Sequence, residues 1–286
     1  MLRTLLNISL RLPLLITLLL GGCATTLEDE TADWTAQRFY DEARDALNNE
    51  SYSEAIKYYT RLEARYPYGR YAQQAQLEVA YAHYKADESA ATIAAADRFI
   101  QLNPRHANVD YAYYLKGLAA YDIEPGTLDR LGNQDRSERD PKRARESFNF
   151  FKELITRFPQ SQYREDSIDR MGKLRNSLAR YEIHVADYYM RRGAYLAAVN
   201  RAKYVVEHYP QTPAVIDAMK LMVNGYRQLK MDDLAADAER VLHHNYPEII
   251  LSPTALKPAP TASALPQSPP DNSAKLPQPP SLPSGF

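Results

Sequence analysis

The chain has 286 residues, of which 45% are hydrophobic and 25% are charged, as is ordinary for a globular protein. Tyrosine is unusually common, with 22 residues, and glycine is scarce, with 10, which favours packed helices over sheets rich in hairpin turns. The formal net charge of −1 provides no basic excess to neutralise phosphates, so we expect no binding of nucleic acid.

Residues 1–22 are predicted to be a signal peptide. Arg3 and Arg11 give a positive start, and the apolar run Leu12–Leu20 is shorter than the roughly 20 residues that span a bilayer. Leu-Gly-Gly then leads to Cys23, the single cysteine. The arrangement resembles the bacterial lipoprotein box, which implies cleavage before Cys23 and its acylation. The alternative is an isolated buried thiol, since cysteine is often buried.

Residues 23–33 are predicted to be a lipidated tether. Each buried acyl methylene contributes about 0.8 kcal/mol, so several acyl chains would hold the protein on a membrane. Ala24 occupies the position where an aspartate usually signals retention in the inner membrane. We therefore expect a lipid anchor on the periplasmic face of the outer membrane.

Residues 34–250 are predicted to form a repeat domain, because five segments end in a similar way. Each ends with a proline that follows an aromatic residue or an asparagine, at Pro67, Pro104, Pro159, Pro210 and Pro247. Counted back from these prolines, mostly apolar or small residues recur 15, 12, 11, 8 and 5 positions earlier, with Asp232 and Glu239 as exceptions in the last segment, and these positions form one face of a helix. The proline ends each helix, because its ring disfavours helical geometry in the preceding residue.

Another apolar-periodic segment precedes each of these helices, at about 34–49, 70–86, 107–121, 162–192 and 212–230. The unit is therefore two helices and a proline, and it resembles the tetratricopeptide repeat. We predict an all-α fold, a solenoid of five tetratricopeptide-like helical hairpins. Asp122–Asp140 is expected to be a loop, and the helix within 162–192 is expected to be long. Such solenoids present an extended concave surface that holds peptides or other domains.

Residues 251–286 hold about half of the 19 prolines and lack the apolar density needed to fold. We predict a disordered Pro-rich tail, more simply a spacer than a proline-rich recognition ligand. The six histidines form neither an HExxH pair nor a zinc pattern with cysteine, and no phosphate-binding loop or GxSxG elbow occurs. We expect no enzymatic activity, no metal and no cofactor.

Three clusters are candidate binding sites. The first is rich in tyrosine and glutamine: Tyr66, Tyr68, Tyr71, Gln73, Gln74, Tyr81 and Tyr84. The second surrounds a turn: Arg98, Asn103, His106, Asn108 and Asp110. Aromatic bodies with polar tips suit contact with a peptide, but repeat packing is the alternative, favoured for Tyr81 and Tyr84. The polar residues of the second cluster could equally satisfy backbone groups of the turn.

The third candidate is Arg201, about 200° around its helix from Val199 and so directed away from the packed stripe. It is either a solvated side chain or an ion-pair anchor for a partner, since arginine offers bidentate geometry. On this basis we expect Arg201→Glu to leave the fold intact.

Four stretches carry a resemblance to a known family: YPYGRYAQQAQL, DRFIQLNPRHANVDYAYYLKGL, DRSERDPKRARESFNFFKELITRFPQSQY and ARYEIHVADYYMRRGAYLAAVNR. Together with the lipoprotein box they resemble the BamD (ComL) family, over about residues 32–246. The proline-rich tail departs from the shorter members.

The resemblance implies five tetratricopeptide repeats in a lipoprotein scaffold of the outer-membrane β-barrel assembly (Bam) complex. It implies binding of BamA periplasmic domains at the C-terminal repeats, with Arg201 in that interface, and BamC and BamE as further partners. It also implies that the N-terminal repeats receive targeting segments of unfolded β-barrel proteins, with Tyr66 and Arg98 at the matching positions. The alternative is a periplasmic repeat lipoprotein associated with peptidoglycan or competence.

Overall fold

The computed structural model describes residues 31–122 and 140–248, and all regular structure in these ranges is helical. The ten helices are α2 (Ala36–Asn48), α3 (Tyr52–Arg65), α4 (Arg70–Lys85), α5 (Ser89–Leu102), α6 (Val109–Ala120), α8 (Lys142–Arg157), α9 (Arg164–Arg191), α10 (Tyr195–His208), α11 (Ala214–Gln228) and α12 (Asp232–Asn245). Within the described ranges, no helix combines the length and the apolar character needed to cross a bilayer. The signal peptide, Cys23, the interior of the predicted loop and the tail lie outside the described residues.

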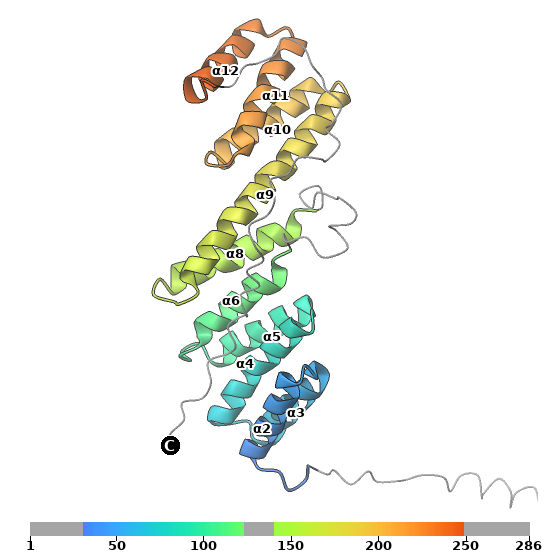
Figure 1. Cartoon of the computed structure of the whole chain (residues 1–286), viewed down its shortest axis with the longest axis vertical. Helices are drawn as coiled ribbons and strands as arrows, with labels where there is room; N and C mark the ends of the chain where they lie inside the picture. The colour runs from blue at the N-terminus through green and yellow to red at the C-terminus, as the bar shows by residue number, and fades with distance from the viewer. Residues whose placement is uncertain (1–30, 123–139, 249–286) are drawn as a thin grey trace, which may run out of the picture.

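The helices pair in chain order into five hairpins: α2–α3, α4–α5, α6–α8, α9–α10 and α11–α12. The hairpins stack into one elongated array, with α2 and α3 at one end and α12 at the other (Figure 1). Most first helices also touch the first helix of the next hairpin, as in α2–α4, α4–α6 and α9–α11. The predicted all-α solenoid of five helical hairpins is confirmed.

Each second helix ends in the same way, two residues before its proline. The residue before the proline donates its backbone N–H to the carbonyl four residues earlier, at 2.8 Å in all five hairpins. Five positions before the proline the side chain is fully buried: Leu62, Phe99, Leu154, Val205 and Leu242. Twelve positions before it a small side chain is buried: Ala55, Thr92, Ser147, Ala198 and Ala235. The common register predicted from the prolines is therefore the register of the core.

Four residues before the proline, the second, third and fourth hairpins carry a partly buried aliphatic residue. Ile100 and Ile155 pack against the central core, and Val206 packs with residues of α11 and α12. In the last hairpin this position is His243, which is exposed.

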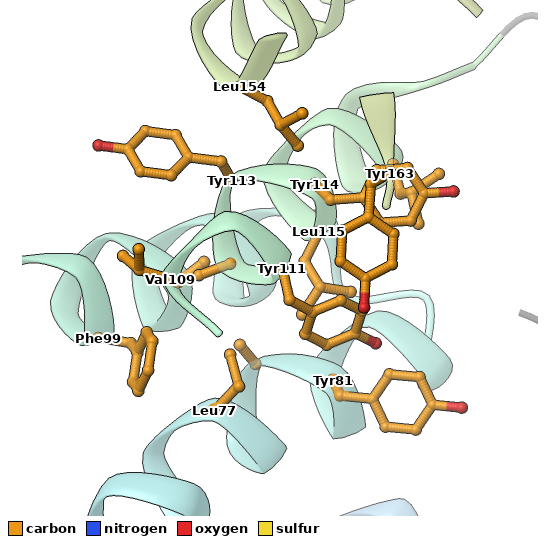
Figure 2. Close-up of a cluster of buried hydrophobic side chains, with 14 of the residues drawn as sticks. Leu77, Tyr81, Phe99, Val109, Tyr111, Tyr113, Tyr114, Leu115, Leu154 and Tyr163 are labelled. Atoms are coloured by element: carbon orange, nitrogen blue, oxygen red, sulfur yellow. The ribbon is translucent and has the colours of Figure 1, made fainter. Parts of the chain in front are cut away.

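The centre of the stack is a cluster rich in tyrosine, built around α6 (Figure 2). Apart from partly buried Asp110, every residue of α6 is buried, because α4, α5 and α8 pack around it. The Tyr114 and Tyr163 rings stack with centroids 4.6 Å apart, and the Tyr114 hydroxyl donates to Asp166 Oδ2 at 2.7 Å. Much of the unusual tyrosine content is thus core, including Tyr81, for which packing was the favoured interpretation.

The longest helix, α9, has 28 residues and takes part in two hydrophobic clusters. Leu174 lies in the central cluster, whereas Ala179 packs with residues of α10 and α11. This confirms the expected long helix, and one continuous helix connects the third hairpin with the fourth.

The close contact between α6 and α8 at Gly117 can be tested by substitution. A Cβ at this position would lie 2.4 Å from the buried ring of Phe151, so the two helices approach closely there. We expect Gly117→Ala to lower the free energy of unfolding by about 1–3 kcal/mol through overpacking. The matched control is Gly172→Ala in α9, where nothing lies within 4 Å and the better helix propensity should stabilise by up to about 1 kcal/mol. Urea unfolding followed by circular dichroism measures both, and stabilisation by both substitutions would contradict the contact.

Candidate functional site

Three of the predicted binding residues define two surfaces: Tyr66 and Arg98 lie on the first two hairpins, and Arg201 lies on the fourth. In residues 31–122 and 140–248, no three His, Cys, Asp or Glu side chains come together to hold a metal ion.

Tyr66 follows α3 directly and is half-buried. Its hydroxyl donates to the Trp34 carbonyl at 2.8 Å, and the neighbouring Arg65 donates to the Ala32 carbonyl at 3.0 Å. These bonds attach the segment before α2 to the end of α3. Tyr68, two residues further along, is 91% exposed.

Arg98 of α5 is brought to the same end of α3. Its guanidinium forms an ion pair with Glu63, while the Arg98 side chain remains 63% exposed. Glu63 also accepts a hydrogen bond from Gln76 of α4 at 3.2 Å, so one carboxylate links α3, α4 and α5. Tyr66 and Arg98 are therefore gathered around the last turn of α3. We call this region, defined by Glu63, Tyr66, Tyr68 and Arg98, the N-terminal surface.

The other polar residues of the second predicted cluster satisfy the turn between α5 and α6. The Asn103 amide donates to Gln76 Oε1 at 2.7 Å, and His106 Nδ1 accepts from the Asn108 backbone at 3.1 Å. Burial lowers the pKa of His106. Asp110 accepts from Ser161 Oγ at 2.6 Å. These bonds are internal to the fold, as expected if the second cluster serves the turn and not the binding of a partner.

A buried carboxyl that the sequence did not single out lies beneath the first two hairpins. Glu78 of α4 is 5% exposed, and its Oε1 accepts from Gln74 Nε2 at 3.0 Å and from the Tyr40 hydroxyl at 3.4 Å. Burial raises the pKa of Glu78 to about 7, since a charge there loses its hydration. The same burial raises the pKa of Tyr40 and of Tyr59.

At the other surface, Arg201 of α10 is not solely solvated. Its Nη1 lies 2.9 Å from Glu182 Oε2, and Arg145 Nη2 of α8 lies 3.3 Å from Glu182 Oε1. The Glu182 side chain is only 2% exposed, whereas the Arg201 side chain is 46% exposed. Arg201→Glu would place a second carboxylate beside the buried Glu182, so we now expect this substitution to destabilise the fold as well.

A hollow beside Arg201 lies between α9 and α10. It is lined by Tyr189, Ala197, Asn200, Arg201 and Tyr204. The Tyr204 ring is 37% exposed and stacks on His208 with centroids 4.0 Å apart. This hollow, with Arg145 and Glu182, is the C-terminal surface; it offers aromatic faces beside a guanidinium.

Glu182 and Arg145 were not predicted as site residues from the sequence, although the position of Glu182 in its helix is unusual. Along α9 the buried residues Leu174, Leu178, Ala186 and Met190 follow a spacing of four, and Glu182 occupies the middle of that stripe. An acid on an apolar stripe requires a buried partner. Nothing in the local pattern distinguishes Arg145 from the other basic residues of α8.

A stack of helical hairpins defines a repeat protein of the solenoid class, whose extended surfaces commonly serve as scaffolds for other chains. The chain belongs to the YfiO family of outer membrane lipoproteins, whose sequence profile matches residues 32–242, and the resemblance to the BamD family is confirmed.

The relatives carry the name outer membrane protein assembly factor BamD. That of Neisseria meningitidis serogroup B is 45% identical over 236 residues, covering 81% of this chain and 88% of the relative. That of Vibrio cholerae is 36% identical over 232 residues, covering 81% and 96%. That of Haemophilus influenzae is 29% identical, covering 81% and 88%.

The raised pKa of Glu78 predicts a pH dependence of stability. Because its pKa rises from 4.5 in the unfolded chain to about 7 in the fold, its stabilisation is complete at low pH and is lost as pH rises through about 7. The loss amounts to about 3 kcal/mol. Glutamine has nearly the same size as glutamate but cannot ionise, so Glu78→Gln should remove this loss. At high pH the free energy of unfolding of the variant should therefore exceed that of the wild type.

Urea unfolding between about pH 5 and pH 9 checks this prediction. The control is Glu42→Gln in α2, an exposed acid, which should keep the wild-type profile. A Glu78→Gln profile with the wild-type slope would show that Glu78 does not titrate in this range.

Proposed function

We propose that this chain is an outer membrane protein assembly factor, a lipoprotein scaffold anchored through acylated Cys23 on the periplasmic face of the outer membrane. The observation that carries the proposal is the family match over residues 32–242, which spans nearly all of the five hairpins. The names of the relatives support the assembly role, and the likeness of the sequence around Cys23 to a lipoprotein box supports the proposed anchor.

At the C-terminal surface, the proposed partner is the set of periplasmic domains of BamA, with BamC and BamE as further members of the complex. Arg201 supports this assignment because it is half-exposed and lies beside the aromatic hollow. Arginine and tyrosine are enriched among the residues that dominate the binding energy of interfaces.

At the N-terminal surface, the proposed ligand is the C-terminal segment of an unfolded outer-membrane β-barrel protein. Such a segment is extended, amphipathic and ends in an aromatic residue and a carboxylate. Arg98 is 63% exposed and can pair with a carboxylate, and the rings of Tyr66 and Tyr68 can contact apolar side chains.

The lipid anchor raises the effective concentration of the scaffold. An acylated chain is confined to the membrane plane beside its partner, so weak contacts at the two surfaces are sufficient for capture and transfer. The two surfaces lie on different hairpins, which leaves the substrate site accessible while the partner is bound.

The first test is a binding titration of the full chain in detergent with isolated BamA periplasmic domains. Arg201→Gln should weaken binding by about tenfold or more, which corresponds to at least about 1.4 kcal/mol, because a guanidinium at the contact is lost. The neutral amide avoids placing a second carboxylate beside Glu182. The matched control, Lys203→Gln, removes one charge from an exposed pair with Glu207 on the same helix and should bind as the wild type does. Equal binding by Arg201→Gln and the wild type would remove Arg201 from the interface.

The second test uses a labelled peptide with the sequence of the last strand of a β-barrel protein, followed by fluorescence anisotropy. Arg98→Gln should weaken binding by several-fold, on the order of 1 kcal/mol, because the carboxylate of the peptide loses its cation. Arg157→Gln is the matched control, since Arg157 is similarly exposed and ion-paired on α8. A blocked C-terminal amide on the peptide should reduce the difference between Arg98→Gln and the wild type; an unchanged difference would exclude the proposed carboxylate contact.

A further inference from the structure

Glu182 joins two consecutive hairpins through a single buried carboxylate. One oxygen accepts from Arg145 on α8, in the third hairpin, and the other from Arg201 on α10, in the fourth. The carboxylate is 2% exposed and belongs to α9, the helix that runs between these two partners. The positions of both guanidiniums therefore depend on one side chain.

The cluster retains binding capacity on its outer side. Two guanidiniums against one carboxylate leave a net charge of +1, and each guanidinium carries five N–H donors. The Arg145 side chain is 50% exposed and that of Arg201 is 46% exposed, so both present donors to the solvent. Glu182 holds the two forks at fixed positions, which reduces the entropy that a ligand must remove.

The surroundings favour a protein ligand over a free anion. The hollow beside Arg201 is bounded by the rings of Tyr189 and Tyr204 and by Ala197. A carboxylate at the guanidiniums would thus be flanked by space for an apolar or aromatic side chain of the same partner.

We propose that Arg145 and Arg201 form one two-guanidinium receptor for an acidic side chain of a folded partner domain, with Glu182 as the residue that positions both. The docking surface then spans the third and fourth hairpins and does not stop at the fourth. The inference rests on the proposed function for the identity of the partner, but the receptor itself is defined by the three side chains.

The direct test measures binding of the full chain in detergent to the BamA periplasmic domains. Arg145→Gln should weaken binding by about tenfold. The double variant Arg145→Gln/Arg201→Gln should be little weaker than either single variant, because one receptor is lost in each case. Arg145→Lys keeps the charge without the fork and should fall between the wild type and Arg145→Gln. Arg157→Gln, on the same helix, should bind as the wild type does.

A positioning role for Glu182 has its own readout. Glu182→Gln leaves both arginines in place but removes the charge that holds them. It should therefore weaken partner binding and also make the losses from Arg145→Gln and Arg201→Gln independent of each other. A purely structural role would lower stability in unfolding experiments without changing how the two arginine substitutions combine.

A second probe separates this receptor from the identity of the partner. A fluorescein-labelled peptide of glutamates and one phenylalanine, at low salt, should bind the wild type and lose affinity with either arginine substitution.

If BamA domains fail to bind but the peptide requires Arg145, the partner of the proposed function is wrong and the receptor stands. If BamA domains bind and both Arg145→Gln and Arg145→Lys match the wild type, the receptor is overturned and the proposed function stands. If neither probe depends on Arg145, the receptor is overturned. Circular dichroism checks that each variant is folded. If Arg145→Gln does not fold, the test is made with Arg145→Lys.

Discussion

The proline after each second helix is the constraint on which the stack depends. Proline has no backbone N–H, and its ring keeps the preceding residue out of helical geometry, so the residue before it makes the last helical hydrogen bond. Each second helix therefore ends at the same position relative to its proline. The side chains five and twelve residues before the proline are buried in all five hairpins. The first is large and the second is small in most cases, so similar contacts can be repeated along the array.

Most of the fold could be predicted because each hairpin is local in sequence. The apolar periodicity predicted the helices, including the long one within 162–192 that is α9, and the prolines predicted their common register. The roles of the tyrosines could not be predicted in the same way. Tyr66 and Tyr68 are two residues apart, yet one is half-buried and the other is almost fully exposed. Both lie in the connection between α3 and α4, where helical spacing no longer determines the direction of a side chain.

The binding surfaces were predicted only in part. The helical position of Arg201 correctly indicated an exposed side, but its ion pair with Glu182 and the second arginine did not follow from the pattern. Arg145 and Arg201 are 37 and 19 residues from Glu182 in sequence, and they meet it because of how three helices pack. Glu78 presents the same case at the other end, since its partners come from its own helix and from α2. Buried acids were visible as polar interruptions of apolar stripes, whereas their partners depended on the tertiary structure.

The continuity of α9 has a mechanical consequence. Its 28 residues make a rod about 42 Å long, which packs against α8 near one end and against α10 and α11 near the other. Because no loop interrupts this rod, the first three hairpins and the last two cannot pivot freely about a hinge. A tilt of about 5° at one end displaces the other by about 4 Å. The two ends of the stack therefore behave as the arms of a lever, and a change in their relative angle requires either bending of α9 or sliding of its neighbours along it.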